Sequence, residues 1–143
     1  MWTRAGTRIA PALAEGDATC IVDLGRASGD APLAQEMTAL LVLVRPVAEH
    51  LVTLSQALPS LRGNAKRVGV VLVGDGDYRP DDVGESLAIE VLGALPTDER
   101  AAETMCGRGR SSNISRSALY RSVTSLAAAI DTSVLASTLE TVS

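Results

Sequence analysis

Four apolar runs alternate with helix-like segments along the chain. Leu40–Val44 and Val68–Val73 are continuous aliphatic runs that lack the polar alternation of a half-exposed strand. Strands of a parallel sheet that is covered by helices on both faces have this pattern. Two further runs, Ala18–Asp23 and Ile89–Pro96, predict two more strands.

The segments between these runs have helical spacing. In Val47–Leu58 apolar residues recur every three or four positions, and Pro59 predicts the end of that helix. The other predicted helices are Trp2–Leu13, Pro32–Met37, one that opens at Pro80, Asp98–Cys106 with Thr97 as N-cap, Ser115–Ile130, and Ser133–Val142 as a second helix or a frayed tail. Strands joined by helix-length connections predict one α/β domain over residues 1–143, with a parallel sheet of about four strands flanked by helices.

Composition narrows the class of protein. The apolar fraction of 46% in 143 residues excludes a disordered chain. Ala118–Ile130 is shorter than a membrane helix, and the first residues do not resemble a signal peptide. A net charge of −4 and 2% aromatic residues argue against nucleic-acid binding by this chain itself. Cys20 and Cys106 are interpreted as free thiols of a cytoplasmic protein.

Candidate chemistry is expected at the strand ends, because ligands of open parallel sheets bind outside the carboxyl ends of the strands. Asp23, Arg45, Gly74-Asp75 and Pro96-Thr97-Asp98 follow the four runs. A carboxylate such as that of Asp23 is a hard oxygen ligand suited to magnesium. From Asp23 alone, a solvated acid that caps the next turn is the favoured interpretation.

Several common sites are missing from the sequence. It contains no Gly-x-x-x-x-Gly-Lys-Ser/Thr phosphate loop, and its only lysine, Lys66, precedes a strand. Gly74–Asp77 lacks the glutamate of a calcium loop and predicts a turn. His50 is predicted to lie on the surface, without a nucleophile or zinc partner. Four arginines in Arg108–Arg121 are interpreted as a solvated basic face rather than a phosphate or acidic-partner site. We therefore assign no catalytic residue.

The order of these segments resembles the C-terminal portion of MinD/ParA-type P-loop ATPases. The likeness is greatest to divergent actinobacterial versions associated with septum-site determination, chromosome partitioning and pilus or secretion assembly. It implies a partial P-loop NTPase-like (Rossmann-like) fold. The segments that carry the resemblance are Cys20–Arg26 (Walker B strand and loop), Leu41–Pro46 with Val47–Leu61 (next strand and helix), Val70–Gly74 (strand toward adenine), Val91–Asp98 (last strand, beside the base) and Ser115–Leu119 (start of the closing helix).

The resemblance implies roles for several strand-end residues. Asp23 would be the Walker B-like acid of a magnesium site, and Gly74, Pro96, Thr97 and Asp98 would lie on the adenine side of an ATP site. The family's Walker A segment and its adenine-reading asparagine near Gly74 have no counterpart in this sequence. Residues 131–143 contain no basic residue and do not resemble the membrane anchor of MinD.

The missing Walker A strand also affects the expected sheet. In the family that strand lies between the strands equivalent to Ala18–Asp23 and Leu40–Val44. Without it, these two strands pair directly or leave a gap. A gap would expose unpaired backbone groups on apolar edges, which invites association.

Three hypotheses follow. In the first, the chain is an ATPase-related regulatory or interaction module in cell division, chromosome partitioning or pilus/secretion assembly. It has no phosphate-binding loop or ATP turnover of its own, and it acts with a protein partner or as a homodimer. In the second, it is an N-terminally truncated fragment of an active ATPase that binds ATP and Mg²⁺. In the third, it is an unrelated receiver- or flavodoxin-like binding domain with Asp23 as phosphoacceptor, although the usual acid pair and lysine are missing.

Overall fold

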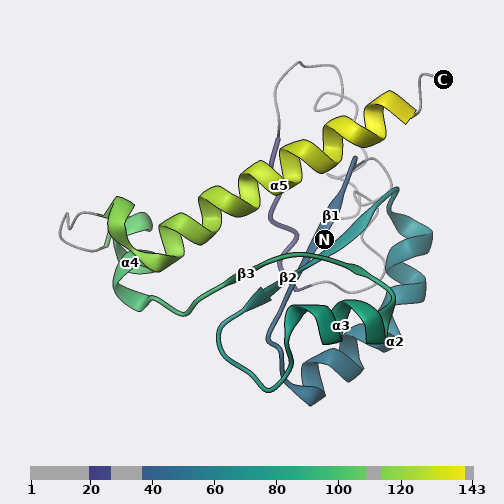
Figure 1. The fold of residues 1–143 in the computed structure, drawn as a ribbon, viewed down its shortest axis with the longest axis horizontal. Coiled ribbons are helices and arrows are strands. Elements are labelled where there is room, and N and C mark those ends of the chain that lie inside the picture. The colour runs from purple at the N-terminus through teal and green to yellow at the C-terminus, as the bar shows by residue number, and fades with distance from the viewer. Residues whose placement is uncertain (1–19, 27–36, 109–113, 141–143) are drawn as a thin grey trace.

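A computed structural model gives the fold (Figure 1) and describes residues 20–26, 37–108 and 114–140. The elements alternate between strand and helix as the sequence predicts. In chain order they are β1 (Leu40–Val44), α2 (Ala48–Asn64), β2 (Val68–Val73), α3 (Pro80–Leu87), β3 (Glu90–Leu95), α4 (Glu99–Met105), the 3₁₀ helix η2 (Ile114–Arg116) and α5 (Ala118–Glu140). None of the described helices is long and apolar enough to span a bilayer.

The three strands form one parallel sheet in the order β1-β2-β3, with β2 in the centre. Val42 of β1 pairs with Val70 of β2, and Val70 pairs with Val91 of β3. The predicted α/β class with a parallel sheet is therefore confirmed. The described part of the sheet has three strands instead of about four.

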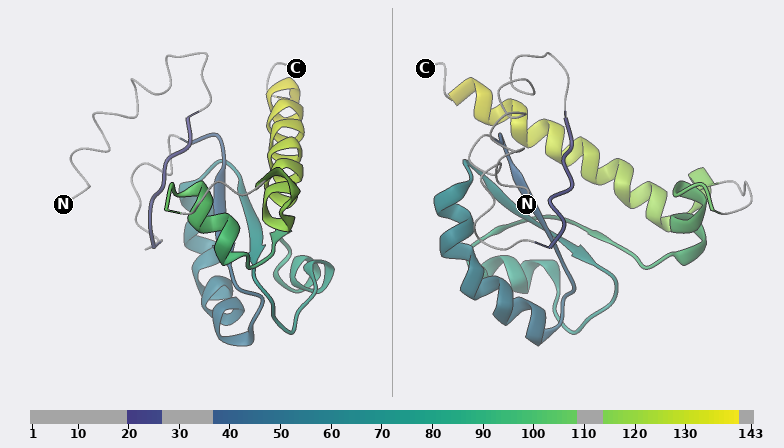
Figure 2. Two further views of the ribbon diagram at one scale, coloured as in Figure 1. Left: turned by 90° about the vertical axis from the view of Figure 1, so that its left-hand side faces the viewer. Right: turned by 180° about the vertical axis from the view of Figure 1, so that it is seen from behind.

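The strand predicted over Ala18–Asp23 is wrong for its described residues. Residues 20–26 form no strand, and Figure 2 shows them as a separate purple segment beside the sheet. Ile21 is 93% exposed, whereas Leu24 packs against the core. The Asp23 carboxylate accepts a hydrogen bond from the N–H of Gly25, whose φ is +68°. Only two aliphatic residues, Ile21 and Val22, precede this turn. So short a run does not specify a strand where the next residues favour a turn.

One face of the sheet is covered by α2 and α3. Alternate strand residues point to this face, because side chains alternate along a strand. Val70 and Leu72 of β2 are fully buried there, against Val83 of α3. The core residues of this face are Leu40, Leu54, Leu58, Leu61, Val70, Leu72, Val83 and Ile89.

The opposite face is covered by α5. Gly93 of β3, which pairs with Val71, has Leu126 of α5 close to it: a Cβ on Gly93 would lie 3.6 Å from Leu126 Cδ1. Figure 1 shows α5 crossing the sheet on the β3 side. The apolar residues at helical spacing along α5 are all half-buried: Leu119, Val123, Leu126 and Ile130.

Helix α2 continues through Pro59, where the sequence predicted its end. A proline inside a helix costs about 3 kcal/mol. Leu58 and Leu61, on either side of it, are both buried in the core. Burial of each leucine contributes about 1.5–3 kcal/mol, which offsets the proline.

Two other helix boundaries differ from the prediction. The N-cap of α4 is Asp98 rather than Thr97, because the Asp98 carboxylate accepts from the N–H of Ala101 at 3.0 Å. α5 is one helix over Ala118–Glu140, because no glycine or proline interrupts it near Asp131. The predicted helices Trp2–Leu13 and Pro32–Met37 lie outside the described residues, apart from Met37.

Candidate functional site

The carboxyl ends of the three strands meet at one edge of the sheet. Two backbone hydrogen bonds join the loops that leave them. The N–H of Gly74, after β2, donates to the carbonyl of Leu95 in β3 at 2.8 Å. The N–H of Asp77 donates to the carbonyl of Pro46, after β1, at 3.0 Å. The loop after β2 is thus fastened to both neighbouring strands.

Two glycines allow this close approach. Gly74 has φ +77°, and a Cβ there would lie 2.9 Å from the Thr97 hydroxyl oxygen. A Cβ on Gly76 would overlap the carbonyl oxygen of Pro46. Glycine is favoured at position 74 because the backbone is left-handed there. It is favoured at position 76 because there is no space for a Cβ.

The structure brings together some of the residues predicted for the adenine side. Gly74 and Thr97 are neighbours, and Pro96 lies between Thr97 and the end of β3. The carboxylate of Asp98 is half-buried and caps α4, which gives it a structural task. An adenine contact by these four residues stays a prediction.

Asp23 is exposed, and its described hydrogen bond is the local one to Gly25 at 2.8 Å. This geometry matches the interpretation of an acid that caps the next turn. Among the described residues, no group of three or more His, Cys, Asp or Glu side chains could hold a metal ion. The magnesium role of Asp23 stays a prediction.

Two backbone N–H groups of the loop after β2 are not available to a phosphate group. A phosphate cradle needs backbone N–H groups that point at the ligand. The N–H groups of Gly74 and Asp77 already donate to protein carbonyls, and the carboxylates of Asp75 and Asp77 are exposed on the same loop. These negative charges oppose the binding of a triphosphate.

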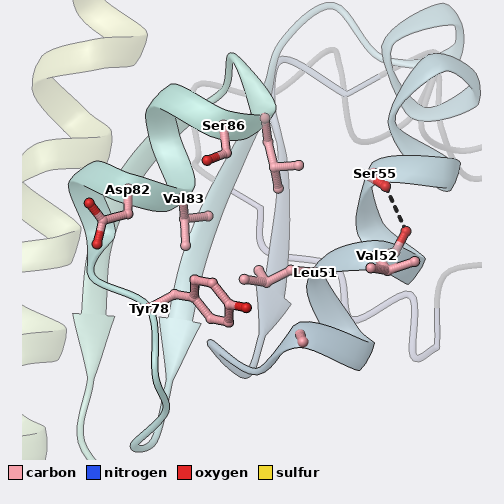
Figure 3. Close-up of a pocket in the computed structure, with 9 residues that line it drawn as sticks. Leu51, Val52, Ser55, Tyr78, Asp82, Val83 and Ser86 are labelled. Atoms are coloured by element: carbon pink, nitrogen blue, oxygen red, sulfur yellow. Dashed lines mark hydrogen bonds between the residues drawn. The ribbon is translucent and has the colours of Figure 1, made fainter.

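The sequence analysis missed a groove between α2 and α3, with a cavity of about 190 Å³. Figure 3 shows Tyr78 reaching from the loop after β2 toward Leu51 of α2, below Val83 of α3. Val52 lies off the apolar stripe predicted for α2, and Tyr78 lies in a loop, so no helical spacing linked them. The residues that line the groove are Ala48, Leu51, Val52, Ser55, Tyr78, Asp82, Val83, Ser86 and Leu87.

Arg62 holds the two helices of this groove together, and no sequence signal singled it out. Its guanidinium donates to the carbonyl oxygens of Leu87 and Ala88, at 3.3 and 2.6 Å. Ala88 is the C-cap of α3 and has a left-handed backbone with φ 48°. Arg62 therefore satisfies carbonyl groups at a helix end that lack partners within the helix.

Other residues considered from the sequence lie on the surface. His50 is exposed, as predicted, and Cys20 and Cys106 are free and exposed. The described arginines of the Arg108–Arg121 stretch are all exposed: Arg108, Arg116 and Arg121.

Comparisons with known proteins identify the fold. No family model matches the sequence, and no curated protein matches it. The crystal structure of a ParA family ATPase from Chlorobium tepidum TLS is similar over 68% of this chain, with a TM-score of 0.51 and 17% sequence identity. The chain spans 43% of the length of that ATPase. The protein thus shares an α/β fold with this ParA family ATPase over the matched part of the chain.

Proposed function

We propose that this chain is a protein-interaction module with a ParA-like fold, and that a partner protein adds a β-strand along the outer edge of β1. The character of that edge carries the proposal. β1 consists of five aliphatic residues, and no strand within the described ranges pairs with its outer side. Leu43 is 63% exposed in it. An apolar strand edge with unpaired backbone groups is a template for strand addition.

We further propose that the chain alone does not hydrolyse ATP. Its only lysine, Lys66, precedes β2, whereas a phosphate-loop lysine follows a strand. The backbone N–H groups of Gly74 and Asp77 are already bonded. The protein would then regulate or assemble with other proteins in cell division, chromosome partitioning or pilus/secretion assembly, in the cytoplasm. Its likeness to a ParA family ATPase supports this class of process.

Site-specific photo-crosslinking in the source cells tests the proposed edge. A benzoylphenylalanine placed at Leu43 is expected to form an adduct with one partner protein. The matched control position is Met105 of α4, which is also apolar and 49% exposed but lies far from β1 (Figure 1). No adduct from position 43, or the same adducts from both positions, would contradict the proposal. An adduct with twice the chain's mass would identify a homodimer in place of a different partner protein.

Phosphate release by the purified chain tests the absence of turnover. We expect no release above buffer with ATP and Mg²⁺, and no difference between the wild-type chain and Asp23→Ala. Turnover that disappears in Asp23→Ala would overturn the proposal and give Asp23 a role in catalysis.

The second candidate is a fragment of a longer ATPase, favoured by the 43% coverage of the ParA family structure. The intact mass of the native protein separates the two candidates. A native mass near 14.8 kDa supports the interaction module. A mass larger by at least about 30 residues, enough for a further strand–helix–strand unit, supports the fragment. The crosslink from position 43 would then form within one chain.

A further inference from the structure

We propose that the groove between α2 and α3 binds a cationic amphipathic helix of a partner protein. This site is separate from the outer edge of β1. The proposal rests on three observations: an apolar floor, exposed apolar residues at the rim, and the carboxylate of Asp82 in the lining, on a segment that carries four further exposed carboxylates.

The floor and rim suit helix side chains better than a small molecule. Leu51 and Leu87 are half-buried in the groove and Val83 is fully buried, while Val52 and Tyr78 at the rim are 56% and 42% exposed. The cavity of about 190 Å³ is smaller than the roughly 300–1,000 Å³ of small-molecule pockets. Helices that dock in grooves insert a few apolar anchors spaced three or four residues apart.

The charge around the groove selects a basic partner. The segment from Asp75 to Leu87, which forms one wall, has five carboxylates and one arginine, Arg79. All five carboxylates are exposed, and none forms a salt bridge within the described part of the chain. α2, the other wall, contributes no charged residue to the lining. The carboxylates are Asp75, Asp77, Asp81, Asp82 and Glu85.

These features together define the partner's chemistry. A helix with leucine-like residues on one face fills the groove, and lysines or arginines at the margin of that face meet Asp82 and the exposed carboxylates of the α3 segment. Complementary charge of this kind fixes orientation and speeds association, while the buried apolar anchors set the dissociation rate.

Fluorescence anisotropy with a defined probe tests the site. The probe is a labelled helical peptide of leucine and lysine with all leucines on one face, at about 0.15 M salt, where the Debye length is about 8 Å. The wild-type chain is expected to bind it more tightly than a scrambled peptide of the same composition. The double variant Val52→Ser/Tyr78→Ser is expected to raise the Kd at least about tenfold, because it removes both exposed anchors.

A charge reversal in the groove and its matched control separate a site from general attraction. Asp82→Lys is expected to raise the Kd about fivefold, because it reverses the charge of the carboxylate that lines the groove. Glu99→Lys makes the same change at an exposed first-turn position of α4, away from the groove (Figure 1), and is expected to change the Kd less than about twofold. Circular dichroism confirms that each variant is folded.

Several results would overturn the proposal. They are equal binding of the scrambled peptide, equal loss in the two charge variants, or an unchanged Kd in Val52→Ser/Tyr78→Ser. Self-association of the wild-type chain that this double variant abolishes would assign the groove to a second copy. The result is independent of the β1 edge, because Leu43→Lys is expected to leave peptide binding unchanged.

Discussion

The two edge strands of the sheet, β1 and β3, differ in their charge and in the regularity of their pairing with β2. β3 begins with Glu90, whose carboxylate forms a salt bridge with Arg67 at 2.7 Å. Its register to β2 shifts between Val70 and Val71, and α5 packs over it near Gly93. Charges and irregular register are devices by which proteins keep strand edges from pairing further. β1 has no charged residue and no register shift along Leu40–Val44.

The two edges of the sheet therefore differ in how strongly they discourage further pairing. A strand can contribute buried residues to the core and still have an outer edge to which no other strand is paired. In β1, Leu40 is buried against the core while Leu43 is largely exposed. The comparison therefore separates a residue that stabilises the core from an exposed one, to which we assign the proposed contact with another chain.

The largest expected effect compares these two leucines. Leu40→Ala is expected to lower the free energy of unfolding by about 2–5 kcal/mol, because it leaves a cavity in the core. Leu43→Ala is expected to change it by less than about 0.5 kcal/mol, as for an ordinary surface substitution. Urea denaturation measures both. An equal loss in the two variants would mean that the native chain already covers the β1 edge.

A smaller effect is expected where β1 is fastened to its neighbour. Gly76→Ala is expected to cost about 1–3 kcal/mol, because the added Cβ would overlap the carbonyl oxygen of Pro46. The matched control is Gly63→Ala in α2, where a Cβ meets nothing within 4 Å and helix propensity favours alanine by about 0.5–1 kcal/mol. Thermal unfolding of both variants measures the difference. If both variants were stabilised, the fastening of the loop would be refuted.

The smallest expected effect is at the β3 edge itself. The ion pair of Arg67 and Glu90 is partly exposed, so its coupling energy is expected to be about 0.2–1 kcal/mol and to fall with salt. A double-mutant cycle of Arg67→Ala and Glu90→Ala measures it. Coupling that persists in high salt would show that the pair holds β3 in place more strongly than its exposure indicates.

β1 and β2 were predictable because each is a continuous apolar run, and all three strands agree with the prediction within one residue at each end. Ala18–Asp23 failed because a turn that starts at Asp23 outweighs two aliphatic residues. The helix end predicted at Pro59 was wrong because tertiary packing outweighs the local signal. The buried leucines on both sides of Pro59 stabilise the helix enough to offset the proline. Thr97 and Asp98 are both good caps, and only the hydrogen bond to Ala101 decides between them.

The candidate site was predictable only in part. The rule that parallel strands end at one edge correctly brings Gly74 and Thr97 together. The contact of Gly76 with Pro46 and the groove at Tyr78 depend on how separate elements pack. No local pattern encodes that packing, so both emerged only from the structure.

The order of the strands has a consequence for how the protein is made. Their order across the sheet repeats their order along the chain, so β1 leaves the ribosome before β2, and β2 before β3. None of the strands described after β1 lies on its outer side. The outer edge of β1 is thus synthesised first among these three strands. A nascent chain would present this edge to chaperones or a waiting partner before synthesis ends.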